Sequence, residues 1–216
     1  MSSESQNTQT RINDPKADWD SATPEQRREI IVDVAISILN EKDISHVTIR
    51  RVASQIGVGA MTLYTYVDGQ QGLRTAILDR GFEIMDSHCD CDEHPKMNNH
   101  ESWVEGCTNY VEFAVHYPNL YTLMFTHPLD QHELANIQSH FERWRHDVHE
   151  YYSELGIKEE DMQPYVERTT RDCWVAMHGL ASLIISQRLQ LNEQEIRQQI
   201  ETLIERLYIE PGQINE

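Results

Sequence analysis

The segment "HCDCDEH", residues 88–94, gathers the side chains best suited to metal or redox chemistry. Two cysteines with one residue between them, flanked by histidines and carboxylates, offer ligands that zinc or copper accepts. A usual zinc knuckle has two residues between its cysteines, and a solvated polar loop explains the same composition. We therefore favour the loop, with oxidation of the two thiols as a further alternative. The metal-site alternative consists of His88, Cys89, Cys91 and His94.

A second stretch, "TIRRVASQIGVGAMTLYTYV" from Thr48 to Val67, carries hydroxyl and guanidinium groups that suit contacts to DNA phosphates and base edges. A helix-turn-helix unit needs a small residue where its helices cross and a turn residue that tolerates unusual dihedral angles. Ala53 and Gly57 meet these two needs. The positions whose spacing predicts a side chain facing inward are occupied by Val52, Ile56, Val58, Leu63 and Tyr66. The alternative is a pair of short amphipathic helices that happen to join at a glycine.

This region resembles a known family. "IIVDVAISILNEKDISHVTIRRVASQIGVGAMTLYTYVDGQQGL", within residues 26–80, is similar to the DNA-binding domain of TetR-type (tetracycline-repressor-like) transcriptional regulators. "HYPNLYTLMF" at 116–125 and "CWVAMHGLASLI" at 173–184 resemble the ligand-binding half of one subgroup, which carries Trp and then His-Gly in a long dimer-forming helix. Trp174, His178 and Gly179 match that pattern.

The resemblance implies that the third helix of the domain enters the major groove. Thr48 is then expected to cap the second helix and touch phosphate, and Arg50 to reach a phosphate or a guanine. The residues expected to contact DNA are Thr48, Arg50, Arg51, Ala60, Thr62, Tyr64, Thr65 and Tyr66. For Tyr66 the alternative is a packing role with its hydroxyl at the rim. Many members place a lysine just after the third helix to grip phosphate, but Gln70 stands there in this chain.

Helical periodicity and sparse glycine predict an all-α chain without strands. We expect a disordered tail over residues 1–22, a three-helix helix-turn-helix DNA-binding domain over 23–72, and a helical ligand-binding and dimerisation domain over 73–216. Thr23-Pro24 is a helix-start signal and Gly57 a helix-stop signal. The expected helices cover about 24–40, 48–56, 60–67, 73 to the polar segment at 88, 101–116, 118–126, 130–155, 161–189 and 192–208.

The charge balance is unusual for a DNA-binding protein, because the 216 residues carry a formal net charge of -18. Residues 21–73 hold five basic and six acidic side chains, whereas residues 74–216 hold 11 basic and 26 acidic ones. The acidity therefore lies outside the expected DNA-binding domain. Exposed charges farther away than a Debye length, about 8 Å at physiological salt, are largely screened. We expect weak non-specific DNA binding that rests on few phosphate ion pairs.

A regulator of this kind needs a dimer interface and a cavity. Two DNA-binding domains must lie about one DNA turn apart, which predicts a homodimer. The expected interface residues are Ala176, Gly179, Ala181, Ile196, Ile200, Leu203 and Leu207. The cavity should be lined by aromatic and flexible side chains of the middle helices: Phe113, Tyr117, Tyr121, Met124, Phe125, Trp144, Trp174, Met177 and His178. For both sets the alternative is burial within one subunit.

The sequence thus predicts a ligand-responsive regulator, most simply a repressor, that binds a palindromic operator as a homodimer and is released by a small amphipathic molecule. No cofactor and no membrane partner is expected, and the polar N-terminus predicts a cytoplasmic protein. A metal- or redox-responsive regulator using residues 88–94 is one alternative. A helical interaction module without DNA binding and a zinc-dependent hydrolase are others, although no nucleophile elbow or paired-histidine motif supports an enzyme.

Overall fold

The computed structural model describes residues 14–87, 100–128 and 131–207. All regular elements in these ranges are helical, which confirms the all-α prediction. The chain forms two compact units, residues 1–80 and 81–216. The boundary lies at Arg80 and Gly81, inside helix α5 (Gly69–Ser87), and so comes later in the chain than residue 72. In the described part of the chain, no helix is long and apolar enough to span a membrane.

The first unit contains the short helices of the predicted DNA-binding domain. Its elements before α5 are α1 (Pro15–Ser21), α2 (Pro24–Glu41), the 3-10 turn η1 (Ile44–His46), α3 (Ile49–Ile56) and α4 (Ala60–Leu63). Helix α2 begins with a capping box, in which the Thr23 hydroxyl accepts from the Gln26 backbone N–H and the Gln26 side chain accepts from the Thr23 N–H. These two reciprocal bonds fix the start of the helix that supports α3.

Helix α1 corrects the prediction of a disordered tail for residues 15–21. Asp14 caps the helix by accepting from the backbone N–H groups of Lys16 and Ala17, and Pro15 occupies the first turn. Trp19 is buried and meets the ring of Tyr66 edge-on at 5.3 Å between centroids. One tryptophan buries enough apolar surface to hold a short helix in place, which a polar composition does not reveal. Residues 1–13 lie outside the described ranges.

The turn between α3 and α4 follows the sequence signals closely. Gly57 has φ +82° and ψ 31°, a left-handed conformation that favours glycine, and its N–H donates to the Ala53 carbonyl. Val52, Ala53 and Leu63 are buried in the core of the unit. Helix α4 ends at Leu63, earlier than the predicted 67, because the Tyr66 N–H donates to the Leu63 carbonyl and residues 64–66 form tight turns.

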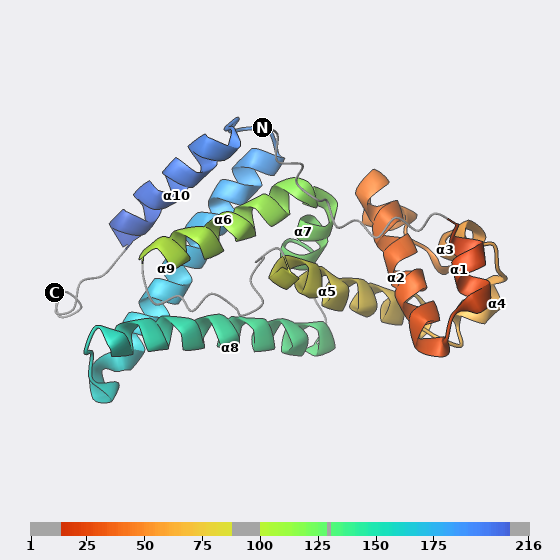
Figure 1. Ribbon diagram of the computed structural model, residues 1–216, viewed down its shortest axis with the longest axis horizontal. Coiled ribbons are helices and arrows are strands. Elements are labelled where there is room, and N and C mark those ends of the chain that lie inside the picture. The colour runs from red at the N-terminus through yellow and green to blue at the C-terminus, as the bar shows by residue number, and fades with distance from the viewer. Residues whose placement is uncertain (1–13, 88–99, 129–130, 208–216) are drawn as a thin grey trace. The chain divides into compact units, whose positions relative to one another are not determined.

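The second unit is a bundle built around one long helix. After α5 it contains α6 (His100–His116), α7 (Pro118–Phe125), α8 (Gln131–Glu154), α9 (Glu159–Ile185) and α10 (Glu193–Leu207). Helices α6, α8 and α10 all pack on α9, and α10 also packs on α6 (Figure 1). Their shared core includes Val111, Val148, Tyr152, Met177 and Ile200. Helix α9 ends at Ile185 rather than 189, because the chain turns back there and the Arg188 N–H donates to the Leu183 carbonyl.

Candidate DNA-binding surface and effector site

Helix α4 and the turn after it present an exposed polar face. Leu63 is fully buried and anchors the element, whereas Thr62, Tyr64 and Thr65 are exposed, with Tyr64 at 54%. Met61 is 80% exposed, more than any other large apolar side chain in the described part of this unit. One buried anchor with hydroxyl groups on the outer side is the arrangement that a helix needs in order to lie in a DNA groove.

The start of α3 carries further residues of the predicted DNA-binding surface. Thr48 caps α3, since its hydroxyl accepts from the backbone N–H of Arg51 at 3.2 Å. Arg50 is exposed, Arg51 is half-buried, and Ala60 at the start of α4 is also half-buried. The capping role predicted for Thr48 is therefore present in the structure, and the guanidinium of Arg50 lies on the surface.

Gln70 has a role that sequence reasoning missed. Its amide nitrogen donates to the Val47 carbonyl at 2.7 Å, and its amide oxygen accepts from the Ile49 backbone N–H at 3.3 Å. Where the family resemblance leads one to expect a phosphate-gripping lysine, this chain has a glutamine that fastens α5 to the beginning of α3. The sequence shows that a glutamine stands where a lysine is expected, but only the fold shows that Gln70 bonds to Val47 and Ile49.

Tyr66 takes its alternative role. Its hydroxyl lies 3.0 Å from Nη1 of Arg27, which donates to it, and its ring packs against Trp19. Arg27 also donates from Nε to the Trp19 carbonyl and lies over the Trp19 ring, with 5.3 Å between the guanidinium carbon and the ring centroid. Because the hydroxyl is engaged within the unit, we assign Tyr66 to packing rather than to the DNA surface.

In the second unit, four of the residues predicted to bind a ligand come together. Tyr121 and Phe125 of α7 meet Trp174 and His178 of α9. The Tyr121 hydroxyl lies 2.6 Å from Nδ1 of His178, and the two rings are stacked at 5.6 Å. Phe125 lies 4.9 Å from Tyr121 and 6.3 Å from His178, measured between ring centroids.

Two further aromatic residues complete this group and were missed by sequence reasoning. The Tyr110 hydroxyl, from α6, lies 3.1 Å from that of Tyr121 and 3.4 Å from His178 Nδ1. The Phe141 ring, from α8, meets Trp174 edge-on at 4.9 Å. We call these residues the aromatic cluster: Tyr110, Tyr121, Phe125, Phe141, Trp174 and His178. An aromatic residue every three to four positions along α6 and into the residue that follows it was the available signal for Tyr110, since Tyr110, Phe113 and Tyr117 have that spacing.

The other predicted ligand residues lie outside the aromatic cluster, and Trp144 among them meets one of its rings. Phe113 and Tyr117 pack on each other at 5.5 Å, and Met177 belongs to the core between α6, α8, α9 and α10. Trp144 packs against the same core and reaches Phe141 at 6.4 Å. Met124 is buried beside Gly81. These five residues form core packing in this structure.

The aromatic cluster is held uncharged near neutral pH. Burial raises the pKa of Tyr121 to about 12. Burial also raises the pKa of Tyr110, a rise that the Trp174 indole partly opposes. For His178, burial lowers the pKa below its ordinary value. A histidine that loses water without gaining an acidic partner favours its neutral form.

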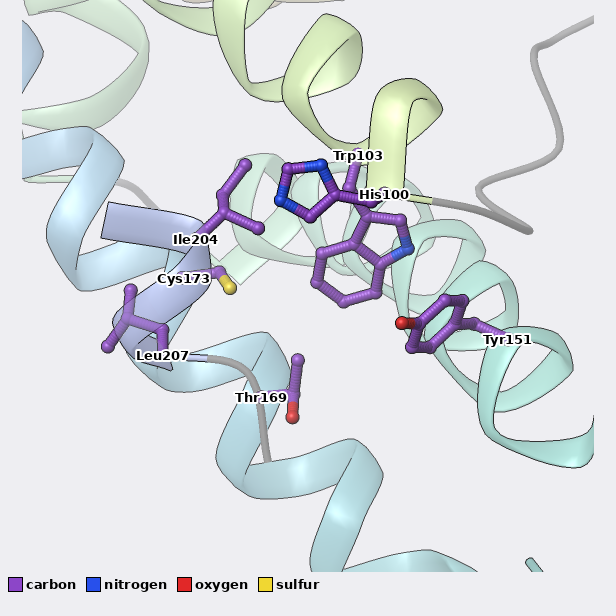
Figure 2. A pocket seen from close by; sticks show the side chains of 7 residues that line it. All are labelled: His100, Trp103, Tyr151, Thr169, Cys173, Ile204 and Leu207. Atoms are coloured by element: carbon purple, nitrogen blue, oxygen red, sulfur yellow. The ribbon is translucent and has the colours of Figure 1, made fainter. Parts of the chain in front are cut away.

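A small hollow lies elsewhere in the same unit. It is lined by His100, Trp103, Tyr151, Thr169, Cys173, Ile204 and Leu207 and has room for about one water molecule. Figure 2 shows the Tyr151 hydroxyl and the Cys173 sulfur among these largely apolar side chains. None of the predicted ligand residues lines this hollow. A drug-sized ligand needs several hundred Å³, so this hollow is too small for one.

The predicted dimer residues divide into two groups. Ala181, Ile196 and Ile200 are buried within the subunit, the two isoleucines against α6 and α9, so their side chains are already covered before any partner binds. Leu203, Leu207 and Ala176 pack partly against the same core. The α10 stripe that suggested an interface faces its own subunit, because a helix at the edge of a bundle buries its apolar side first against its neighbours.

Gly179 belongs to an exposed strip on α9. Val175 is 61% exposed and Leu183 44%, and both lie four residues from Gly179 on the same helix face. A Cβ atom built at Gly179 meets nothing within 4 Å, so the helix backbone is open to a partner there. We call Val175, Gly179 and Leu183 the α9 strip.

The metal alternative falls on residues 88–94, which lie outside the described ranges. Within the described ranges, no group of three or more His, Cys, Asp or Glu side chains is placed to hold a metal ion.

Residues 103–207 match the family model described as "Tetracyclin repressor-like, C-terminal domain". Over these residues the chain is similar to the C-terminal domain of TetR-like regulators. A 50-residue stretch is 38% identical to the HTH-type transcriptional repressor DrrR1 of Streptomyces coeruleorubidus. That stretch covers 23% of this chain and 18% of the repressor, so less than a fifth of the relative is matched.

Solved structures share the TetR-like fold. A protein of unknown function from Rhodococcus sp. RHA1 superposes with a TM-score of 0.68 at 17% identity, covering 87% of this chain and 96% of that one. A TetR-family regulator from Streptomyces coelicolor gives 0.66 at 15% identity, with 85% and 79% covered. A TetR from Acinetobacter baumannii AYE in complex with minocycline gives 0.55 at 12% identity, with 83% and 96% covered. These likenesses establish the fold of both units.

Proposed function

We propose that this TetR-like protein is a transcriptional repressor that binds a palindromic operator as a homodimer and leaves it when a small amphipathic molecule binds its second unit. The observation that carries the proposal is the outward-facing α4: Thr62, Tyr64 and Thr65 are exposed around the buried anchor Leu63. A protein that used this unit only for packing would have no need for a row of exposed hydroxyl and aromatic groups at this position. The related repressor DrrR1 supports repression rather than activation.

The DNA contacts follow from this geometry. The exposed hydroxyls of Thr62 and Tyr64 are suited to phosphate oxygens, and Thr65 and Ala60 are suited to base edges or a thymine methyl group. Arg50 supplies the exposed guanidinium at the edge of the surface. With Gln70 occupied at Val47 and Ile49, affinity rests on these neutral contacts more than on ion pairs.

Homodimer formation is proposed through the α9 strip. Two copies of α9 crossing at Gly179 bring their backbones close, with Val175 and Leu183 packed on either side of the crossing point. A two-fold axis there makes the contact self-complementary and gives two DNA-binding units for two half-sites.

Effector control is proposed at the aromatic cluster. It joins α6, α7, α8 and α9, so a molecule that enters it changes how these helices pack. The A. baumannii structure in complex with minocycline supports a small-molecule effector for this fold. A ligand shifts the DNA-binding equilibrium only if it binds the two states with different affinity. Such a protein acts where chromosomal DNA is present, which agrees with the cytoplasmic location expected from the sequence.

The test is operator selection followed by titration. The full chain is used to enrich binding fragments from a random duplex library, and the dissociation constant for the enriched site is measured by gel shift. We expect one enriched palindrome and a loss of at least about tenfold in affinity for the double variant Arg50→Ala/Tyr64→Ala. Arg188→Ala, an exposed arginine on the second unit, is the matched control and should bind like the wild type.

Failure to enrich any sequence would leave the helical interaction module as the better description. Equal affinity of the double variant and the control would show that DNA is bound through another surface.

A further inference from the structure

The aromatic cluster contains more hydrogen-bond donors than its internal bonds use. Its four polar groups are the hydroxyls of Tyr110 and Tyr121, the neutral imidazole of His178 and the indole N–H of Trp174. Together they carry four O–H and N–H protons. Two close bonds, at 3.1 Å and 2.6 Å, join Tyr110 to Tyr121 and Tyr121 to His178. Two protons therefore remain without an acceptor in good hydrogen-bond geometry, whichever ring nitrogen of His178 carries its proton.

One of these protons is identified by its position. Nε1 of Trp174 is buried and close enough to the Tyr110 hydroxyl to oppose the rise of that group's pKa, but no acceptor among the described residues meets it with hydrogen-bond geometry. Indole nitrogen is a donor only, so a buried indole N–H without an acceptor is destabilising unless an acceptor is supplied. The Trp174 ring lies 6.0 Å from His178 and 4.9 Å from Phe141, which places the unused donor at the edge of the aromatic cluster.

The charges around the cluster favour a neutral acceptor over a cation. An aromatic group of this kind would attract an ammonium ion by cation–π interaction, and such cages usually gain from a nearby carboxylate. The hydrogen bonds of Tyr110, Tyr121 and His178 within the described residues involve no carboxylate. Burial alone shifts the pKa of His178, and it shifts it downward, whereas an acidic neighbour would raise it.

Phe125 is the ring that a ligand would replace. It is the last residue of α7, it is half-buried, and it contacts Tyr110, Tyr121 and His178 at 5.6, 4.9 and 6.3 Å between ring centroids. A planar ligand in its place would contact the same three rings and bring its own polar group near the donors. Residues in the middle of α7, such as Tyr121, are fully buried and less free to move.

From these observations we propose that the effector of this protein is an uncharged aromatic molecule with a carbonyl-type acceptor, bound in place of Phe125 with its acceptor held by Trp174 and the Tyr110–Tyr121–His178 group. This inference rests on the proposed function, since it specifies the ligand of the proposed effector site. It adds Tyr110 to the binding residues and excludes permanent cations as preferred ligands.

The test compares three probes of similar size: 2-acetylnaphthalene, 2-isopropenylnaphthalene and the 2-naphthyltrimethylammonium ion. The first two have nearly the same shape and differ in the carbonyl oxygen. Binding to the full chain is measured by calorimetry. We expect the ketone to bind about three- to tenfold more tightly than the hydrocarbon, as one or two net hydrogen bonds imply, and the cation to bind most weakly.

Variants assign that preference to the cluster. Trp174→Phe and Tyr121→Phe should each lower the ketone-to-hydrocarbon ratio toward one, while Phe125→Ala should tighten both neutral probes and leave the ratio unchanged. The matched control is Tyr152→Phe, which removes another buried hydroxyl of the same unit, bonded to Thr169 at 2.8 Å. It should leave the ratio as in the wild type. Circular dichroism checks that each variant is folded.

Several results would overturn the proposal: equal affinities for the two neutral probes, a preference for the cation, a ratio that survives both ring-conserving variants, or no binding to the wild type and Phe125→Ala. Operator binding is measured with the same preparations, so that failure of this inference can be distinguished from failure of the proposed function. A protein that binds its operator but shows no carbonyl preference refutes this inference alone, whereas one that binds no DNA refutes the proposed function.

Discussion

Arg27 of α2 donates a hydrogen bond of 3.0 Å to the hydroxyl of Tyr66, which follows the DNA-facing helix α4. The same guanidinium holds the Trp19 carbonyl and covers the Trp19 ring, so one side chain ties α1, α2 and the end of the helix-turn-helix together. Helix α1 is therefore part of the DNA-binding unit. Its contribution is to hold Tyr66, the residue that follows α4 by three positions, through the ring of Trp19.

Two tyrosines separated by one residue should respond differently to loss of the hydroxyl. Tyr66→Phe removes the bond to Arg27 and should lower the free energy of unfolding by about 1–2 kcal/mol, with operator affinity changed by less than about twofold. Tyr64→Phe removes an exposed hydroxyl and should leave stability unchanged but weaken operator binding. Urea unfolding and gel-shift titration measure the two quantities. A larger loss of DNA affinity in Tyr66→Phe than in Tyr64→Phe would return Tyr66 to the DNA surface.

The turn glycine offers a prediction with an internal control. Gly57→Ala places a side chain at φ +82°, a left-handed conformation that costs an L-residue about 1–2 kcal/mol. The added Cβ also comes within 3.3 Å of the flexible Lys16 side chain. Gly59→Ala, two residues away, has φ -73° and its nearest neighbour is Thr62 Oγ1 at 3.8 Å, so it should be nearly neutral. Equal stabilities of the two variants in urea unfolding would contradict the assigned turn.

Local signals in the sequence predicted the helices well. Thr23-Pro24 marks the start of α2, Thr48 caps α3 and Gly57 ends it, because capping and left-handed turns depend on neighbouring residues only. The same holds for Leu63 as the anchor of α4. The bounds failed where a distant contact decided the structure, as for α1, whose helix is held by Trp19 against Tyr66.

The candidate sites were predicted less completely, because they depend on which helix faces which. Tyr121, Phe125, Trp174 and His178 were recognised by type and resemblance, but their meeting with Tyr110 and Phe141 requires α6 and α8 to pack on α9. The spacing of the isoleucines on α10 is the same for a dimer surface and for a core contact, so periodicity alone does not distinguish the two. In the structure Ile196 and Ile200 lie in the core.

The α9 strip makes a prediction about assembly. Val175→Glu and Leu183→Glu should each shift the protein from dimer to monomer, since they place a charge in the proposed two-fold contact. Leu155→Glu is the matched control, because Leu155 is similarly exposed, at 42%, but lies outside the strip. Ile200→Ala should instead lower the free energy of unfolding by about 2–5 kcal/mol, as a core truncation does. Analytical ultracentrifugation and urea unfolding measure these effects, and dimers in both glutamate variants would exclude this interface.

The charge distribution makes a prediction about salt. Each phosphate contact by a basic group contributes a slope of about -0.9 to log affinity against log salt, so a protein with few such contacts should show a total slope no steeper than about -6. Arg50→Ala should reduce the slope by about one unit for each subunit bound. Arg188→Ala, on the second unit, should leave it unchanged. A steeper wild-type slope would mean that basic groups outside the described surface reach the DNA.

His178 predicts a pH dependence of stability. Burial holds its pKa in the folded protein below the ordinary value near 6.5, so between these two pKa values the unfolded chain binds more protons than the folded one. Stability contributed by the neutral ring is therefore fully present above about pH 6.5 and declines as the pH falls through that value. The chain has 11 histidines, so the difference between wild type and His178→Gln isolates this contribution. Between pH 7.5 and 5, the free energy of unfolding measured in urea should fall more steeply for the wild type than for His178→Gln. Equal slopes for the two proteins would mean that His178 is solvated and free to take up a proton in the folded protein.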